Sequence, residues 1–357
     1  MISDNVLGDI PSIDTPIDRA VALGLNGYTD EAQKLLREYP DQQDPSVVFN
    51  LGWYDLFNGN LSKGMKALDA GRIVECYGSQ PLPGPIWRDE PLEGKTILFH
   101  CEGGIGDNII HFRFAQDFRD MGAQVVISCN VGLARLFNQH GFITVSNQNP
   151  QIAPYIYYDF WIPAMSAGHI LNYEYDTLSG KPYLFSPARN LPSKLNSLKV
   201  GIRWSGNPQF AHEDLRQFPR ELMFDLLSIE NVTFYSLQRD ADLVSDLPLI
   251  DLKDEMVDFS ETAKIIMGLD LVITSCTSIA HCAAALGVET WVVIPLLPYY
   301  VWALQGDTSP WYNSVKLYRQ EVFREWHQPF ENIKRDLINK TSALNMEKKI
   351  ESHLVAK

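Results

Sequence analysis

Apolar residues recur along this chain in short runs that predict two α/β halves. The runs form two series typical of buried strands, the first at 96–100 and 124–129 and the second at 199–204, 232–237, 271–273 and 290–294. Amphipathic helical patterns follow the first series at 107–121 and 131–140. Strands that alternate with such helices are typical of a parallel sheet with crossover helices. We therefore predict two Rossmann-like domains, 95–190 and 191–328, with a cleft at the carboxyl ends of both sheets.

The first 78 residues predict paired helices instead of a sheet. An Asn-Gly pair, a small residue, a lysine and a leucine in 25–36 return 32 residues later in 57–68. This pattern resembles a tetratricopeptide-like repeat, in which the Asn-Gly turn separates two helices and Ala32 and Gly64 lie where paired helices approach closely. Two units are fewer than the about three that such arrays need to stand alone, so we expect a degenerate cap over 1–78 that packs on the next domain. An ordinary helical extension fits the two-unit match equally well.

Proline and glycine predict the domain boundaries. Residues 79–94 carry four prolines and two glycines, which preclude a continuous element, and they form the first predicted linker. The stretch 186–197 has two prolines and no periodicity, and it is the predicted interdomain linker. A final helix is predicted within 329–357, and the first half is a candidate surface for it to brace.

The composition narrows the class of protein. A chain of 357 residues that is 45% hydrophobic predicts two or three compact, soluble domains. Lys and Arg number 30 against 44 Asp and Glu, and the resulting net charge of −14 repels a nucleic-acid backbone. A nucleic-acid polymer is therefore disfavoured as a partner, whereas a small anionic substrate stays compatible. The five cysteines form no C-x-x-C pair, so we expect reduced thiols and not a disulfide framework or a zinc ribbon.

The sequence predicts neither a membrane span nor a secretion signal. No apolar run approaches the roughly 20 residues that cross a bilayer. The N-terminus lacks both the positive charge and the apolar run of a signal peptide. A cytoplasmic location without a transmembrane segment is the expectation.

Two short strand-to-helix turns carry the clearest chemical signal. Residues 103–108 follow the first apolar run with three glycines, and 274–281 follow a run of the second series with several hydroxyl side chains. Such turns leave backbone N–H groups at a helix N-terminus, where the helix dipole also favours negative charge. The pair of turns therefore predicts a nucleotide-linked or phosphorylated substrate. Gly103, Gly104 and Gly106 would let the backbone approach such a ligand, although a tight turn for packing also requires glycines.

The first of these turns resembles a known family. Residues 103–115 are similar to the first strand-to-helix turn of the heptosyltransferase-like (ADP-heptose type) GT-B glycosyltransferases, especially those fused to tetratricopeptide repeats. The resemblance covers about 95–320, and it implies an α/β fold in which two Rossmann-like domains face a cleft behind a helical extension. The further segments that fall in the family's order are 200–208, 235–238, 258–263, 280–287 and 309–312.

The same resemblance implies an activity. It is the transfer of a hexosyl or heptosyl group, with inversion, from a nucleoside-diphosphate sugar to an acceptor hydroxyl on a glycan, a lipid-linked molecule or a protein. The donor is a substrate, and the resemblance implies no bound metal and no cofactor. Asp107 matches the family's proposed general base, and a carboxylate can take the proton that the acceptor hydroxyl loses as it attacks. The alternative for Asp107 is a cap at the N-terminus of its helix.

Donor-binding candidates lie mainly in the second half. Hydroxyls at a helix N-terminus can bind a diphosphate, and a positioned guanidinium can stabilise the leaving diphosphate without a metal. The candidates are Arg203, Trp204, Ser205, Gly206, Asn207, Arg216, Gln238, Arg239, Ser275, Thr277, Ser278 and His281. Surface salt bridges are the alternative for the arginines, and a half-buried structural role is the alternative for the histidine. The family usually has an aspartate where this chain has Cys276, which could alter how donor hydroxyls are held.

Acceptor-side candidates lie in the first half. They are His111, Arg113, Trp161 and Ser166. The aromatic stretch 155–161 suits acceptor binding, and an apolar wall is the alternative for its tyrosines. Stacking on a base or a sugar is a candidate role for three tryptophans, with core packing as the alternative, namely Trp204, Trp302 and Trp311.

Two other functions stay open at this stage. A non-catalytic GT-B module that binds a nucleotide, a glycan or a protein fits the acidity and Cys276, and a nucleotide-sugar epimerase shares the two-domain architecture. The chain has no P-loop or H-E-x-x-H motif, and its first turn is not the dinucleotide-binding G-x-G-x-x-G. The pair Asp240 and Asp242 could hold a divalent cation, with a solvated loop as the alternative.

Overall fold

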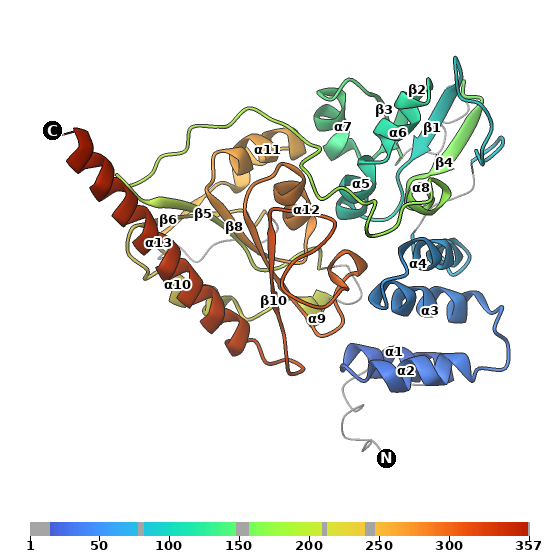
Figure 1. Cartoon of the computed structure of the whole chain (residues 1–357), viewed down its shortest axis with the longest axis horizontal. Helices are drawn as coiled ribbons and strands as arrows, with labels where there is room; N and C mark the ends of the chain where they lie inside the picture. Colours follow the sequence, from blue (N-terminus) through green and yellow to red (C-terminus); the bar gives the residue numbers. More distant parts are fainter. Residues whose placement is uncertain (1–14, 78–81, 148–156, 209–212, 240–246, 356–357) are drawn as a thin grey trace. The chain divides into compact units, whose positions relative to one another are not determined.

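The two series of strands fold into separate sheets, and the chain divides into two units accordingly. The computed structural model describes residues 15–77, 82–147, 157–208, 213–239 and 247–355. One unit is Met1–Tyr183 with Leu296–Trp311, and the other is Leu184–Pro295 with Tyr312–Lys357. Each unit contains one parallel sheet, so the predicted α/β class is confirmed (Figure 1).

Helices pack in pairs at the start of the first unit. An Asn-Gly turn separates the helices of each pair, and Gly27 and Gly59 adopt φ values of +87° and +84°, which side chains disfavour. A Cβ on Gly64 would lie 2.5 Å from Leu56 Cγ, so the predicted close approach of paired helices is confirmed there. Whether the pairs are tetratricopeptide repeats stays a prediction. The elements are α1 Pro16–Leu25, α2 Thr29–Arg37, α3 Pro45–Phe57, α4 Leu61–Leu68 and the 3-10 helix η2 Asp69–Arg72.

A four-stranded parallel sheet in the order β3-β2-β1-β4 forms the rest of the first unit. The predicted strands 96–100 and 124–129 are confirmed at both ends. The helix predicted over 107–121 is two helices, because a 3-10-type hydrogen bond from the Phe114 N–H to the His111 carbonyl interrupts it. The elements are β1 Thr96–His100, α5 Ile105–Phe112, α6 Ala115–Asp120, β2 Gln124–Cys129, α7 Val131–Asn138, β3 Ile143–Ser146, β4 Phe160–Pro163 and α8 Ala164–Ile170.

The second unit is built on a six-stranded parallel sheet in the order β10-β9-β8-β5-β6-β7. Its central strands are buried along most of their length, which explains their near-continuous apolar sequence. The elements are β5 Leu198–Arg203, α9 Glu213–Arg216, α10 Arg220–Leu226, β6 Val232–Ser236, β7 Leu249–Asp251, η4 Lys253–Glu255, α11 Phe259–Met267, β8 Leu271–Ser275, α12 Ser278–Ala285, β9 Thr290–Ile294, β10 Val315–Arg319 and α13 His327–Val355.

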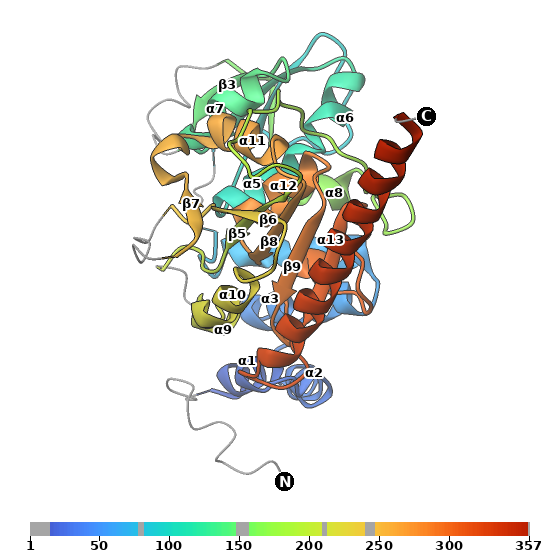
Figure 2. The ribbon, with the colours of Figure 1, turned by 90° about the vertical axis from the view of Figure 1, so that its left-hand side faces the viewer.

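The last helix belongs to the second unit. The sequence offered the first half as a surface for it to brace, and that expectation is wrong, because Phe330, Ile333 and Leu337 of α13 lie in the core of the second unit. Figure 2 shows α13 running beside the strands of that unit. Phe330 contacts Phe218, with 4.7 Å between ring centroids. The apolar face of α13 is therefore satisfied by its own sheet.

The packing of α13 gives a stability prediction. Leu337→Ala is expected to lower the free energy of unfolding by about 2–5 kcal/mol, because Leu337 is fully buried and its removal leaves a cavity. Ile338→Ala is the control, since the neighbouring side chain is 44% exposed, and it should cost less than about 1 kcal/mol. Chemical denaturation measures both, and equal effects would contradict this packing.

Residues 296–311 lie in the second half of the sequence but belong to the first unit. The sequence placed residues 296–311 within the domain 191–328, whereas the structure groups them with the first unit. Their aromatic side chains explain the difference. Tyr299 and Tyr300 contact Trp53 of α3 at 5.4 and 5.8 Å between ring centroids, and the 3-10 helix η5 (Tyr300–Trp302) is buried.

No helix in the described part of the chain combines the length and apolar character that a membrane crossing requires.

Candidate functional site

Each sheet has a point where the order of its strands reverses. In the first unit the chain runs from β1 outward to β2 and β3 and then returns to place β4 on the other side of β1. In the second unit it runs from β5 to β6 and β7 and then places β8 on the other side of β5. Ligands of open α/β sheets bind outside the carboxyl ends of the strands at such a reversal. The turns after β1 and β8, which the sequence singled out, both border one.

The turn after β1 is built around Gly103 and Asp107. Gly103 has a φ of +67°, and a Cβ there would lie 2.7 Å from Asp107 Oδ2. That carboxylate oxygen accepts the Gly104 N–H at 2.7 Å, so Asp107 caps α5, and Gly106 lies in the first helical turn. The capping alternative from the sequence is thus present, and it accounts for one of the two carboxylate oxygens.

The other oxygen of Asp107 has a partner that the sequence did not reveal. Asp107 Oδ1 accepts the Tyr299 hydroxyl, and one turn further along α5 the His111 Nε2 lies 2.7 Å from the Tyr300 hydroxyl. Burial, with Arg113 nearby, lowers the pKa of His111 to about 3, so this imidazole is neutral. Burial and then Asp107 raise the pKa of Tyr299 well above its ordinary value.

Arg113 of the first unit binds the C-terminal end of the segment 296–311. Its Nη1 and Nη2 each donate to the Trp311 carbonyl at 3.1 Å, and Nη1 also donates to the Ser179 carbonyl. The guanidinium carbon lies 4.5 Å from the Tyr183 ring centroid and 5.0 Å from that of Trp311. Arg113 therefore holds residues 296–311 against the rest of the first unit.

The other acceptor-side candidates make separate contacts. Trp161 is buried in β4 beside Leu98 and donates its indole N–H to the Gly84 carbonyl at 3.1 Å. Ser166 donates to Asp69 Oδ1 at 2.6 Å. Part of the aromatic stretch 155–161 lies outside the described residues.

Behind the glycine turn lies a charged network that the sequence analysis missed. Arg72 donates from Nε and Nη2 to the two oxygens of the buried Glu102 at 2.6 and 2.5 Å. Arg72 also donates to Asp69 at 2.6 Å, and His169 Nε2 lies 2.9 Å from the same carboxylate. Arg72 and Asp69 are only three residues apart, but tertiary packing alone brings Glu102 and His169 to them, so no spacing in the sequence predicted the network. The network fixes the residue that precedes Gly103.

In the second unit, buried polar groups gather at the carboxyl ends of three adjacent strands. Arg203 ends β5 and donates from Nη1 to the Leu237 carbonyl at 3.0 Å, just beyond β6. The Gln238 side-chain oxygen accepts the Ser205 N–H at 3.2 Å and the Trp204 N–H at 3.4 Å. Ser275 ends β8 and is fully buried. Three predicted donor residues, Arg203, Gln238 and Ser275, thus lie at neighbouring strand ends.

Two polar atoms of this cluster have unused hydrogen-bonding capacity. Within the described residues, neither Ser275 Oγ nor Gln238 Nε2 has a hydrogen-bond partner. The two side chains are 0% and 1% exposed. A buried polar group without a partner costs about 1–3 kcal/mol in stability. Two such groups at the same end of one sheet therefore call for a functional explanation.

A buried carboxylate, Glu213 of α9, lies at the same end of the sheet. It accepts the Gly206 N–H through Oε1 and the Arg216 Nε–H through Oε2, the latter at 2.6 Å. Arg216 in turn donates from Nη1 to the Cys276 carbonyl at 2.8 Å. The salt-bridge alternative for Arg216 is therefore present, but the pair ties α9 to the turn after β8. The sequence analysis did not single out Glu213, because nothing in its local pattern marks a buried acid.

Some of the remaining donor candidates lie in the turn after β8 and in α12, and the others are exposed or lie in the core. Thr277 is the N-cap of α12, Ser278 is its first residue, and His281 Nδ1 lies 3.3 Å from the Tyr312 hydroxyl. Asn207 and Arg239 are exposed. Trp204, Trp302 and Trp311 are buried, as the core alternative required, and Asp240 and Asp242 lie outside the described residues.

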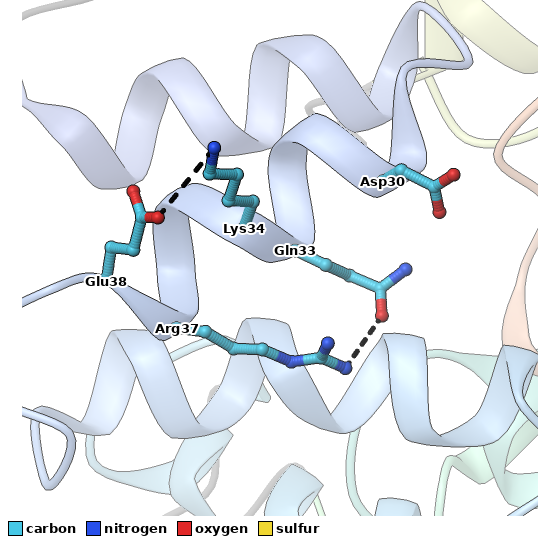
Figure 3. Close-up of a pocket in the computed structure, with 5 residues that line it drawn as sticks. All are labelled: Asp30, Gln33, Lys34, Arg37 and Glu38. Carbon is cyan, nitrogen blue, oxygen red and sulfur yellow. Dashed lines mark hydrogen bonds and ion pairs between the residues drawn. The ribbon is translucent and has the colours of Figure 1, made fainter.

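A hollow on α2 has a different character. Figure 3 shows it lined by polar side chains of a single helix, in which Arg37 Nη2 donates to Gln33 at 3.1 Å and Lys34 lies 3.9 Å from Glu38. Its lining residues are Asp30, Gln33, Lys34, Arg37 and Glu38. These are ordinary solvated helix-surface pairs, so we assign the hollow no role.

No family model matches the sequence. A curated relative, Protein FlbA of Caulobacter vibrioides, is 26% identical over 314 residues, which cover 75% of this chain. The chain spans about half (51%) of the length of that relative.

Several solved structures of glycosyltransferases resemble the chain. TibC, an iron-containing dodecameric glycosyltransferase from enterotoxigenic E. coli H10407, has a TM-score of 0.48 and 12% identity, covering 72% of this chain and 78% of its own. The E. coli ADP-heptose lps heptosyltransferase II has a TM-score of 0.47 and 12% identity, covering 71% and 99%. A glycosyl transferase family 9 protein from Veillonella parvula has a TM-score of 0.49 and 10% identity, covering 72% and 99%.

Proposed function

We propose that this protein is a GT-B glycosyltransferase that moves a sugar from a nucleoside-diphosphate sugar to an acceptor hydroxyl. One observation carries the proposal: Ser275 and Gln238 present buried hydrogen-bonding atoms without a partner in the described structure, next to Arg203 and the reversal of strand order. The sequence resemblance over about 95–320 supports the same class of reaction.

The second unit is suited to an anionic donor. A diphosphate oxygen has acceptor capacity for the Ser275 hydroxyl and the Gln238 amide, and Arg203 supplies positive charge. The N-terminus of α12 adds backbone N–H groups and its dipole, with Thr277 as N-cap. These groups would also stabilise the charge that the leaving diphosphate gains, which is the basis for proposing a reaction without a bound metal or cofactor.

The first unit is suited to removing a proton. The Asp107 carboxylate stands at the N-terminus of α5, with one oxygen fixed by the Gly104 N–H. In an inverting reaction the acceptor oxygen attacks the anomeric carbon directly, the bond from that carbon to the diphosphate breaks, and Asp107 takes the hydroxyl proton. The acceptor is a glycan, a lipid-linked molecule or a protein in this proposal.

Ser275→Ala tests the donor site with effects of opposite sign. Because the substitution removes a buried hydroxyl that lacks a partner, the free energy of unfolding should rise by about 1 kcal/mol in the free protein. The affinity for a nucleoside diphosphate should fall about tenfold, since one hydrogen bond is lost. Chemical denaturation and calorimetry with ADP, GDP and UDP measure the two quantities.

Ser197→Ala is the matched control for this test. Ser197 lies just before β5, at the amino end of the sheet, and its hydroxyl donates to the Lys194 carbonyl at 2.8 Å. Its loss should destabilise the protein by about 1 kcal/mol and leave nucleotide affinity unchanged. A Ser275→Ala variant that binds every diphosphate as tightly as the wild type would remove the donor-site assignment.

Product analysis separates the proposal from its rivals. A donor that is bound but neither hydrolysed nor transferred would indicate a non-catalytic module, and a donor sugar that isomerises without an acceptor would indicate an epimerase. Transfer to an acceptor hydroxyl with an inverted anomeric centre is the expected result.

A further inference from the structure

The segment 296–311 presents two phenols to one face of α5. Asp107 and His111 are four residues apart and therefore lie on the same side of the helix. Tyr299 donates to Asp107 Oδ1, and the Tyr300 hydroxyl lies 2.7 Å from His111 Nε2. The two tyrosine rings are 4.5 Å apart. Asp107 and His111 thus each contact the hydroxyl of a different tyrosine.

Several contacts from distant parts of the first unit hold Tyr299 in place. Trp53 makes an edge-to-face contact with it, with 5.4 Å between ring centroids and 65° between ring planes, so the helical region contributes directly to holding Tyr299. Arg113 fastens the other end of the segment through the Trp311 carbonyl. Residues 299 and 107 are 192 positions apart, and ordering so distant a partner costs conformational entropy that a simple helix cap does not require.

Asp107 consequently accepts hydrogen bonds from two donors, one on each carboxylate oxygen. The Gly104 N–H binds one carboxylate oxygen, which is enough to cap α5, and the Tyr299 hydroxyl binds the other. The raised pKa of Tyr299 keeps its proton in place over the range in which enzymes work, so the phenol stays a donor. Two donors restrict rotation of the carboxylate and favour its charged form.

We infer that Tyr299 is a positioning residue for Asp107: it orients the carboxylate and keeps it ionised for removal of the acceptor proton. The inference rests on the proposed function, because it takes Asp107 as the general base. A base whose orientation is fixed by a further hydrogen bond is the arrangement that acid–base sites commonly use. Trp53 supports Tyr299 from α3, which gives the helical region a part in the chemistry.

Tyr299→Phe tests the role through activity. Removing the hydroxyl should lower kcat about tenfold without changing KM for the donor, because Tyr299 acts through Asp107 and not on the nucleotide. The acid limb of the kcat/KM profile should move to higher pH by about one pH unit, since the charged carboxylate loses a donor. An unchanged kcat with an unchanged acid limb would overturn the inference.

Tyr173→Phe is a closely matched control. The Tyr173 hydroxyl donates to Asp117 Oδ1 of α6 at 2.9 Å, so this variant removes the same kind of phenol–carboxylate hydrogen bond from the same unit. We expect kcat and the acid limb to stay as in the wild type. If Tyr173→Phe moved both to the same extent as Tyr299→Phe, the effect would be general loosening of the unit, and the inference would fail.

A measurement without substrate separates this inference from the proposed function. In protein labelled with ¹³C at the aspartate carboxyl carbons, the Asp107 signal is assigned by its loss in Asp107→Asn and titrated by NMR. Its midpoint should move to higher pH in Tyr299→Phe and not in Tyr173→Phe. Trp53→Leu, which keeps the phenol but removes its edge contact, should produce a smaller shift in the same direction.

The combined outcomes are distinct. An Asp107 midpoint that is the same in the wild type, Tyr299→Phe and Trp53→Leu would overturn the positioning role whatever the activity. A midpoint that moves as expected, in a wild-type protein that transfers no sugar from any donor, would support the effect of Tyr299 on the carboxylate and count against the proposed transferase.

Discussion

Asp107→Asn is expected to lower kcat for sugar transfer by about 10²- to 10⁴-fold, the range that general-base catalysis typically contributes. The amide keeps an oxygen that can accept the Gly104 N–H, so the cap on α5 can survive. The amide does not take up the acceptor proton, because an amide oxygen is far less basic than a carboxylate. The dissociation constant for a nucleoside diphosphate should change less than about threefold, since the proposed donor contacts lie in the second unit. Initial rates at saturating substrates and calorimetry provide the two measurements.

Asp44→Asn isolates the effect of the substitution itself. Asp44 is the N-cap of α3 in the same unit, and its carboxylate accepts the Ser46 N–H at 2.8 Å. This variant should transfer sugar at the wild-type rate. If Asp107→Asn also kept a rate within a few-fold of the wild type, Asp107 would be a helix cap and the base would have to be sought elsewhere.

Arg203→Met is expected to weaken the binding of a nucleoside diphosphate about 100-fold, which corresponds to about 2.7 kcal/mol. The guanidinium is buried at the end of β5, where charge-assisted hydrogen bonds to a phosphate are strong. Methionine preserves much of the length and the apolar stem, although it leaves the Leu237 carbonyl without the Nη1 donor. The transfer rate should fall as well, because the leaving diphosphate loses a compensating charge. Calorimetry measures the affinity, and circular dichroism verifies that the variant is folded.

Arg189→Met supplies the comparison for this variant. Arg189 also lies in the second unit and pairs with Glu255, but its side chain is 40% exposed. Loss of such a surface pair should leave nucleotide affinity unchanged. A folded Arg203→Met protein with wild-type affinity would show that the diphosphate does not bind at the β5 and β8 strand ends.

The strongly apolar strands were predictable from the sequence, whereas very short strands and strands of mixed pattern were not. β1, β2 and β9 have the predicted bounds, because each contains at least three consecutive apolar residues that are buried. The sequence analysis missed β3, β4, β7 and β10, which have three to five residues each. β3, β7 and β10 mix polar with apolar residues, and β4 has only four residues. Such segments become strands because a neighbouring strand offers hydrogen bonds, which is a property of the sheet.

The candidate site shows the same division. Gly103 and Asp107 were found because a positive φ and a helix N-terminus restrict residue choice locally. The Tyr299 hydroxyl on Asp107 was not found, because the two residues meet only after the 296–311 segment joins the first unit. Glu213 and the Arg72–Glu102 pair were missed for the same reason, since each acid has an arginine or a backbone N–H as a partner only in the folded chain.

The amino-acid sequence by itself determined the α/β class, the strands of greatest burial, the Asn-Gly turns and the two turns that present backbone N–H groups, because these depend on interactions within a few residues. Tertiary structure alone decided where residues 296–311 and α13 belong, and which side chains surround Asp107 and Ser275. The physical reason is that burial and hydrogen bonding between distant segments are settled by the whole chain. A residue's own neighbours in sequence carry little information about them.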